Sequence, residues 1–221
     1  MKNMFIFIFL CLSFLTHAAI KGERTLTDQV ENNGQVIHIQ EVYKTVDTFK
    51  LKIDIFYTDQ SFERKNNTAI VFFHGGGWAF GLALCTAMID DYSEKSDNLS
   101  ISCRPDAILL FSACVNAVEG WCDRLLADRR NKIWSISPAH NIKRGMPPMI
   151  EFHGKYDEQV PIWTVQFFES AMKKESNYFE LHTYEGMRHY LGEGNPKYSR
   201  YFDDEILKIA DDFLLKNTLI N

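Results

Sequence analysis

Two groups of residues in this chain have the types needed to act on a carbonyl group. The first is His74 and the three glycines that follow it, Gly75, Gly76 and Gly77, directly after the apolar run 69–73. Consecutive residues without Cβ allow several backbone N–H groups to face one position, where they can stabilise a negatively charged oxygen. A glycine turn after a core strand is the ordinary interpretation of the glycines alone. The flanking histidine and tryptophan favour the functional one, so we expect Gly75 and Gly76 to form an oxyanion hole.

The second group consists of Asp157 and, farther along the chain, His189. A carboxylate that orients an imidazole, and the imidazole that then moves a proton, are two of the three members of a hydrolytic triad. Taken singly, Asp157 is an ordinary turn residue and His189 an ordinary surface histidine. Because each follows a predicted strand, the pair favours catalysis. We interpret His153 and His182 as structural.

The third member, a nucleophile, is missing from the sequence. No Gly-x-Ser-x-Gly pentapeptide, the usual strained turn that presents a catalytic serine, is present. Ser112 follows a predicted buried strand but has no flanking glycines to relieve crowding. Cys85 and Cys114 have apolar flanks that disfavour the reactive thiolate. We therefore expect the acid and the base to be present without their nucleophile.

The elements that must position these residues alternate along the chain. Period-two apolar patterns predict an antiparallel pair at 36–46 and 49–57, and buried or half-buried strands are predicted at 69–73, 107–111, 149–152 and 179–183. Helices are predicted at 82–91, after Pro161 with an inner face of Phe167, Phe168, Ala171 and Met172, and from Asp203 with Ile206, Ile209, Ala210, Phe213 and Leu214 on one face. From residue 69 onward, this order predicts an α/β fold with a mostly parallel sheet flanked by helices. The site then lies at the carboxyl ends of the strands.

Length and composition limit the possible architectures and partners. With 221 residues, 46% of them hydrophobic, the chain is long enough for one well-buried domain, which we place at 34–217. The formal net charge is −5 and no basic run occurs, so a nucleic-acid partner is not expected. A small-molecule substrate fits better, and no motif indicates a metal or an organic cofactor. The sequence gives no information on the oligomeric state.

The N-terminus has the three regions of a secretory signal peptide. Lys2 precedes the apolar run 4–15, and small residues follow at Ala18 and Ala19. We expect residues 1–19 to be removed and the protein to be secreted or periplasmic, with a non-cleaved anchor as the alternative. No later segment approaches the roughly 20 apolar residues of a membrane helix.

After such cleavage four cysteines remain: Cys85, Cys103, Cys114 and Cys122. Four cysteines permit three pairings, among which the sequence does not choose. A Cys114–Cys122 disulfide and two buried thiols both remain open, and none of the four has zinc-site spacing.

The chemistry-bearing segments together resemble the α/β-hydrolases. The run from His74 to Gly77 is similar to the His-Gly-Gly-Gly loop of the hormone-sensitive-lipase-like and acetyl-esterase-like branch. His153-Gly-x-x-Asp157-x-x-Val-Pro and Gly-x-x-His189 are similar to that family's acid and base segments. The resemblance implies an exported carboxylic ester hydrolase with Asp157 and His189 as catalytic residues.

The resemblance also implies an internal excision. Only a few residues separate Gly77 from Leu82, where the family has two further strands, their helices and the nucleophile. We therefore expect an incomplete α/β-hydrolase fold that lacks the central strands before the nucleophile, with the neighbouring strands closed up or left unpaired. The alternatives are a non-catalytic hydrolase-like binding protein, a truncated gene product and, more weakly, a prolyl-oligopeptidase-like serine peptidase.

Overall fold

The computed structural model of the protein describes only part of the chain. The described residues are 4–10, 36–46, 48–58, 68–74, 84–85, 88–89, 100, 104–118, 127–191 and 203–217. They divide into two compact units, one containing strands β2 and β3 and the other containing all remaining elements. The site belongs to the second unit.

The first unit is a two-stranded antiparallel ribbon. Strand β2 (Val36–Val46) pairs with β3 (Phe49–Thr58), with a register shift between Val42 and Lys44. This pairing confirms the antiparallel pair expected from the period-two pattern. Across the strands, His38 Nε2 lies 2.9 Å from Asp54 Oδ1.

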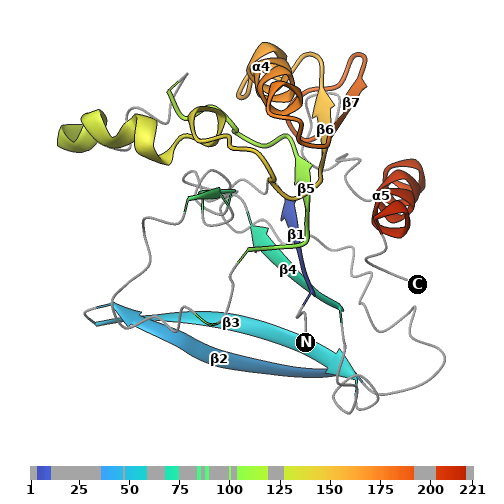
Figure 1. The fold of residues 1–221 in the computed structure, drawn as a ribbon. Coiled ribbons are helices and arrows are strands. Elements are labelled where there is room, and N and C mark those ends of the chain that lie inside the picture. Colours follow the sequence, from blue (N-terminus) through green and yellow to red (C-terminus); the bar gives the residue numbers. More distant parts are fainter. Residues whose placement is uncertain are drawn as a thin grey trace. The chain divides into compact units, whose positions relative to one another are not determined.

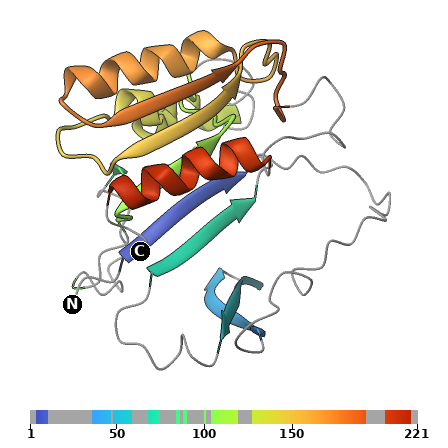
Figure 2. The same cartoon turned by 90° about the vertical axis from the view of Figure 1, so that its right-hand side faces the viewer.

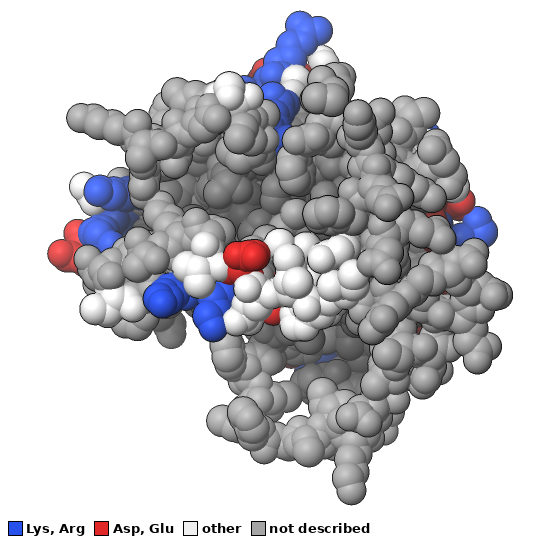
Figure 3. Space-filling view, turned by 90° about the horizontal axis from the view of Figure 1, so that it is seen from below, with Lys and Arg blue, Asp and Glu red and all other residues white. Residues whose placement is uncertain are grey.

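On the face seen in Figure 3, the blue and red side chains of the described residues are scattered, and neither sign forms a continuous patch.

The second unit is built on a five-stranded sheet of order β4-β1-β5-β6-β7, in which every pairing is parallel (Figures 1 and 2). The strands are β1 (Met4–Leu10), β4 (Thr68–His74), β5 (Ala107–Phe111), β6 (Met149–Gly154) and β7 (Phe179–Tyr184). Strands β5 and β6 are buried along their whole length. Such continuous burial is typical of strands that are covered on both faces of a parallel sheet. The observed sheet confirms the predicted α/β class and matches a partial α/β-hydrolase fold.

Strand β1 differs most from the sequence expectation. Its residues lie within the segment predicted to be a signal peptide, yet β1 pairs with β4 on one side and with β5 on the other. The neighbours of the excised segment were expected to close up or stay unpaired. Instead, the apolar run Met4–Leu10 lies between them and supplies the backbone hydrogen-bonding partners that a central position requires. A chain cleaved after residue 19 would lack this strand.

Two helices flank the sheet on opposite faces, as Figures 1 and 2 show together. Helix α4 (Ile162–Lys174) lies against β7, and α5 (Asp204–Lys216) lies against β6. The Asp203 side chain caps α5 by accepting a hydrogen bond from the Glu205 backbone N–H at 3.1 Å. Helix α5 buries Ile206, Ala210, Phe213 and Leu214 of its predicted apolar face, whereas Ile209 is only partly buried.

The predicted inner face of α4 was partly wrong. Val165, Phe168 and Met172 are buried, whereas Phe167 is 48% exposed and Ala171 is only partly buried. Successive helical residues are rotated by about 100°, so a face through 165, 168 and 172 turns position 167 toward solvent. The adjacent Phe167 and Phe168 therefore cannot both point into the core.

Two short 3₁₀ segments, η2 (Ala127–Ile136) and η3 (Pro138–His140), connect β5 to β6. Of the predicted helix 82–91, the described residues Leu84, Cys85 and Met88 are helical and buried. None of the helices in the described ranges has the length and apolarity to cross a lipid bilayer.

Disrupting β1 tests whether the N-terminal run is part of the folded sheet. In the unprocessed 221-residue chain, Ile8→Pro is expected to lower the free energy of unfolding by about 3 kcal/mol or more, because proline removes a ladder donor inside a central strand. Urea unfolding measures this change, with Ile8→Val as the matched control. Equal stability of the two variants would show that residues 4–10 do not pair in the sheet.

Candidate active site

Asp157 and His189 are brought to the same edge of the sheet by neighbouring strands. Strands β6 and β7 are parallel and in register through Gly154 and Tyr184, so the loops that follow them leave the sheet side by side. The two loops are joined by backbone hydrogen bonds, from Lys155 N–H to the Tyr184 carbonyl at 3.0 Å and from Tyr156 N–H to the Met187 carbonyl at 2.9 Å. The two loops therefore form one hydrogen-bonded unit that fixes Asp157 and His189 relative to each other.

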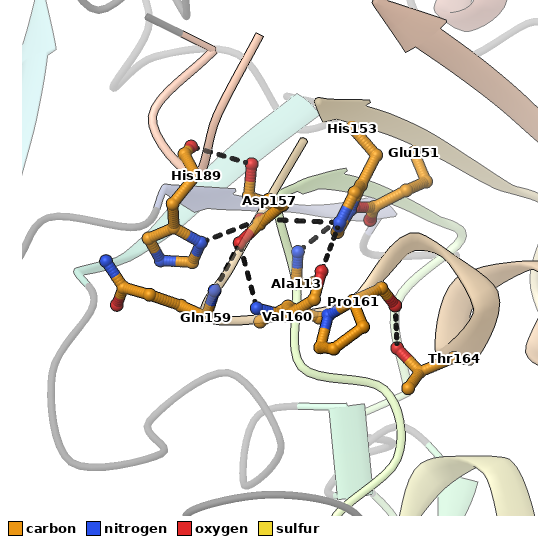
Figure 4. A network of polar contacts seen from close by, with 10 residues as sticks. Ala113, Glu151, His153, Asp157, Gln159, Val160, Pro161, Thr164 and His189 are labelled. Atoms are coloured by element: carbon orange, nitrogen blue, oxygen red, sulfur yellow. Dashed lines mark hydrogen bonds and ion pairs between the residues drawn. The ribbon is translucent and has the colours of Figure 1, made fainter. Parts of the chain in front are cut away.

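The Asp157 carboxylate and the His189 imidazole are in hydrogen-bonding contact (Figure 4). His189 Nδ1 lies 2.8 Å from Asp157 Oδ2, and both residues are buried, with exposed fractions of 4% and 5%. The other carboxylate oxygen, Oδ1, accepts from the backbone N–H groups of Gln159 at 2.9 Å and Val160 at 2.8 Å. Because the carboxylate can only accept when ionised, Nδ1 of His189 carries its proton and Nε2 is left for proton transfer.

The backbone of His189 is held as firmly as its ring. Its carbonyl oxygen accepts from the Ser112 hydroxyl at 3.2 Å and from the Leu191 N–H at 2.8 Å. Ser112 is 1% exposed and has a φ of 50°, an uncommon conformation for a residue with a side chain. Since its hydroxyl donates to this carbonyl, Ser112 has the geometry of a residue that positions His189. That geometry does not fit an exposed nucleophile.

A second pair of buried groups lies behind Asp157. Glu151 and His153 project from the same side of β6 and both side chains are fully buried, with Glu151 Oε1 and His153 Nδ1 2.9 Å apart. Burial raises the pKa of Glu151, and the hydrogen bonds from His153 and Ala113 only partly oppose this. Burial by itself would lower the pKa of His153, but the contacts with Glu151, Asp157 and the Val160 carbonyl together outweigh it and the net shift of this pKa is upward.

The sequence analysis interpreted His153 as structural and did not single out Glu151. A signal for both was available, because charged or polar residues at 151 and 153 interrupt the apolar strand Met149–Gly154. Charged side chains are almost never fully buried unless they are paired. Such an interruption therefore indicates a polar network inside the sheet.

The predicted oxyanion hole cannot be placed in the structure. Gly75, Gly76 and Gly77 lie outside the described residues, and of His74 only the backbone, at the end of β4, is described. Strand β4 is parallel to the other strands, so it ends at the edge that carries Asp157 and His189. In the part of the chain that the structure describes, no group of three or more His, Cys, Asp or Glu residues is arranged to hold a metal ion.

The described cysteines do not supply the missing nucleophile. Cys85 and Cys114 are both buried thiols. Burial raises the pKa of Cys85 to about 12, and its Sγ lies 2.7 Å from the Ile136 carbonyl oxygen. A thiol with that pKa is almost entirely protonated at neutral pH, which confirms the expected inertness of Cys85. Cys103 and Cys122 lie outside the described residues.

Gly154 is the position at which the two catalytic loops touch most closely. A Cβ at this residue would lie 2.6 Å from the Arg188 carbonyl oxygen and closer still to that of Met187. Both contacts are with backbone, which cannot rotate away as a side chain can. Only glycine lets the loop of His189 approach the end of β6 this closely.

Gly154→Ala is therefore expected to displace residues 187–188 and, with them, the His189 ring. We expect a loss of about 1–3 kcal/mol in the free energy of unfolding and loss of the His189–Asp157 hydrogen bond, measured by urea unfolding and by NMR of the imidazole N–H. Gly186→Asn is the control, because a Cβ there meets nothing within 4 Å and asparagine tolerates the φ of 71°. An equal loss in both variants would contradict the close-contact explanation.

Comparison with known proteins identifies one matching protein family and a set of similar solved structures. The model of the prolyl oligopeptidase family matches residues 113–216, which include Asp157 and His189. Among curated proteins, none matches the chain in sequence.

Solved structures of one bacterial esterase resemble the chain over much of its length. The propionate-bound esterase 2 of the planctomycete Thermogutta terrifontis is 34% identical, with a TM-score of 0.55, over 68% of this chain and 57% of that one. The apo form gives 34% identity and a TM-score of 0.57 over 69% of this chain and 57% of that one. The tabun-modified form gives 33% identity and a TM-score of 0.56 over 68% of this chain and 56% of that one.

The chain thus spans a little over half the length of the esterase structures that it matches. The parallel sheet of this chain agrees with its structural similarity to these esterases. The sheet and the matches together show that the chain has part of the α/β-hydrolase fold.

Proposed function

We propose that this chain is an exported carboxylic ester hydrolase by descent, from the His-Gly-Gly-Gly esterase and lipase branch, and that it has lost its nucleophile. The observation that carries the proposal is the buried hydrogen bond of 2.8 Å between His189 Nδ1 and Asp157 Oδ2 at the carboxyl edge of the parallel sheet. Oriented in this way, an imidazole can take a proton from a nucleophile and return it to a leaving group.

Each proposed residue has a defined role in acyl transfer. His189 is the general base and then the general acid, and Asp157 fixes its ring and stabilises the imidazolium form. The Gly75 and Gly76 amides stabilise the oxyanion of the tetrahedral intermediate. The roles of His74 and Gly77 are to complete that loop.

A small ester is the proposed substrate class. The matched esterase 2 is described in complex with propionate and with butyrate, and as phosphorylated by paraoxon. Those findings belong to that protein, and they support esters with short acyl groups as the first substrates to test on this chain.

The proposed loss of activity rests on the nucleophile. The sequence has no Gly-x-Ser-x-Gly segment, the Ser112 hydroxyl is bonded to the His189 carbonyl, and the Cys85 thiol is protonated. In serine hydrolases, the oxyanion hole and substrate binding without the triad leave roughly 10³ to 10⁴-fold acceleration over water. Such a residual rate is difficult to detect.

Two alternatives concern the same missing segment. A truncated gene product and a non-catalytic hydrolase-like binding protein would both retain Asp157 and His189 without a nucleophilic serine. Re-reading the genomic DNA between the codons for Phe80 and Leu82 discriminates between them. An encoded Gly-x-Ser-x-Gly segment would show that the chain is a shortened form of an active enzyme.

A serine peptidase is the weaker alternative, favoured by the prolyl oligopeptidase family match. That match covers residues 113–216 and therefore the acid and base segments, but it does not reach the loop that begins at His74. Hydrolysis of a proline-containing peptide anilide, with no hydrolysis of small esters, would favour the peptidase.

Export is proposed from the N-terminal segment. We expect intact-mass analysis of secreted material to show that residues 1–19 are absent, because the apolar run with its small flanking residues is a cleavable leader. An N-terminus at Met1 in the secreted protein would favour an uncleaved anchor. A secreted and cleaved chain would lack β1.

The activity proposal predicts little or no hydrolysis of p-nitrophenyl acetate by the purified 221-residue protein. His189→Ala and Ser112→Ala are the test variants. His38→Ala, which removes a half-exposed histidine of the β2–β3 ribbon, controls for non-specific reaction with imidazole. Robust turnover that His189→Ala abolishes and His38→Ala does not would disprove the loss of activity. If Ser112→Ala abolished it as well, Ser112 would be the nucleophile.

A further inference from the structure

Glu151 is a carboxyl group in the middle of the sheet with few partners. It lies on β6 between Leu110 of β5 and Leu181 of β7 in the strand register, and its side chain is fully buried. Its Oε1 accepts from the Ala113 N–H at 3.0 Å and lies 2.9 Å from His153 Nδ1. Among the residues that the structure describes, none is a hydrogen-bonding partner of its Oε2. Burying such a group costs free energy, so its retention calls for an explanation.

The protonation of His153 follows from its neighbours (Figure 4). His153 Nε2 lies 2.8 Å from the Val160 carbonyl oxygen, which can only accept, so Nε2 carries a proton. The remaining contact, between Nδ1 and Glu151 Oε1, then requires one more proton. Without it, two lone pairs would face each other at 2.9 Å. Glu151 and His153 therefore share one proton and together carry no net charge.

The neutral pair touches the carboxylate that orients His189. His153 Nε2 lies 3.3 Å from Asp157 Oδ2, the oxygen that also contacts His189 Nδ1 at 2.8 Å. A fully charged imidazolium at this distance would compete with His189 for the carboxylate. A ring whose charge is balanced by Glu151 leaves the charge of Asp157 to His189. Its Nε2–H donates to the Val160 carbonyl, and the N–H of Val160 in turn donates to Asp157 Oδ1.

We propose that Glu151 and His153 are positioning residues, which share a proton so that Asp157 is held from behind while its negative charge remains directed at His189. The proposal rests on the proposed function only in the roles given to Asp157 and His189. It extends the site from two residues to a connected row of four: Glu151, His153, Asp157 and His189.

The isosteric substitution Glu151→Gln separates charge balance from packing. If the amide oxygen replaces Oε1, His153 must carry protons on both ring nitrogens and becomes an imidazolium with no anion except Asp157. If the amide NH₂ group replaces Oε1, it faces the Ala113 N–H. The first orientation removes the charge balance of the pair, and the second is disfavoured because two donors face each other, while the volume of the side chain is kept in both.

We expect the substitution to weaken the hydrogen bond between His189 and Asp157. In ¹H and ¹⁵N NMR of histidine-labelled protein, the His189 Nδ1–H resonance of Glu151→Gln should move upfield and exchange with solvent roughly tenfold faster. Ser137→Ala is the matched control, because Ser137 is fully buried and its Oγ accepts from the Ala117 N–H at 3.0 Å, away from the row. A structural role alone would lower the stability of both variants and leave the resonance in place.

An unchanged His189 Nδ1–H resonance in folded Glu151→Gln would overturn the proposal. Should that variant fail to fold, the wild-type protein decides. A proton shared between Glu151 and His153 at neutral pH supports the proposal, and a His153 Nδ1 without a bound or shared proton refutes it. None of these measurements needs turnover. Robust ester hydrolysis by a chain with the expected response would therefore refute only the proposed loss of activity, and an unchanged resonance in an inactive chain would refute only the positioning role.

Discussion

The carboxylate of Asp157 is the group on which the site of this protein depends. It is buried, and its Oδ1 accepts from two backbone N–H groups of its own loop while Oδ2 contacts the rings of His189 and His153. An ionised carboxylate in such a place is stable only when its oxygens are satisfied. The turn after β6 and the loop after β7 each donate hydrogen bonds to this group, and the buried pair on β6 contacts it through His153, so the three are coupled.

The contacts at this edge of the sheet come from one part of the chain. The acid and the base remain in contact, the loop of His189 is fixed by the Ser112 hydroxyl and Gly154 permits its close approach. These contacts belong to β5, β6 and β7 and the loops that follow them, all within residues 104–191. The proposed excision lies upstream, between Gly81 and Leu82. A folded contact between Asp157 and His189 is thus compatible with the proposed loss of the nucleophile, because the two depend on different parts of the chain.

The N-terminal run is subject to two incompatible physical demands. Its length and apolarity suit a cleavable leader, and the same properties suit a strand buried between two parallel neighbours. In the structure, residues 4–10 pair with β4 and β5 and join the strand that ends at His74 to the strands that carry the site. Cleavage would leave β4 without the only described strand to which it is hydrogen-bonded. The N-terminal segment therefore cannot be removed on export and also form β1 of the sheet.

The sequence by itself determined the elements whose patterns are local. The alternation in β2 and β3, the apolar runs of β4 to β6 and the spacing of Ile206, Ala210 and Phe213 in α5 each reflect a fixed backbone period, so no distant contact was needed to predict them. Asp157 and His189 could be paired because each follows a predicted strand, and parallel strands end at a common edge. The absence of Gly-x-Ser-x-Gly was likewise visible in the sequence.

Only the tertiary structure decided the features that depend on partners distant in the chain. It placed the leader-like run between β4 and β5, turned Phe167 outward, joined the Ser112 hydroxyl to His189 and revealed that Glu151 and His153 contact the back of Asp157. The spacing of apolar residues along a helix or strand predicts which of its faces is buried, but it does not predict which residues pack against that face. Register between strands, and the hydrogen bonds that buried polar groups must find, are settled by the whole sheet as it packs.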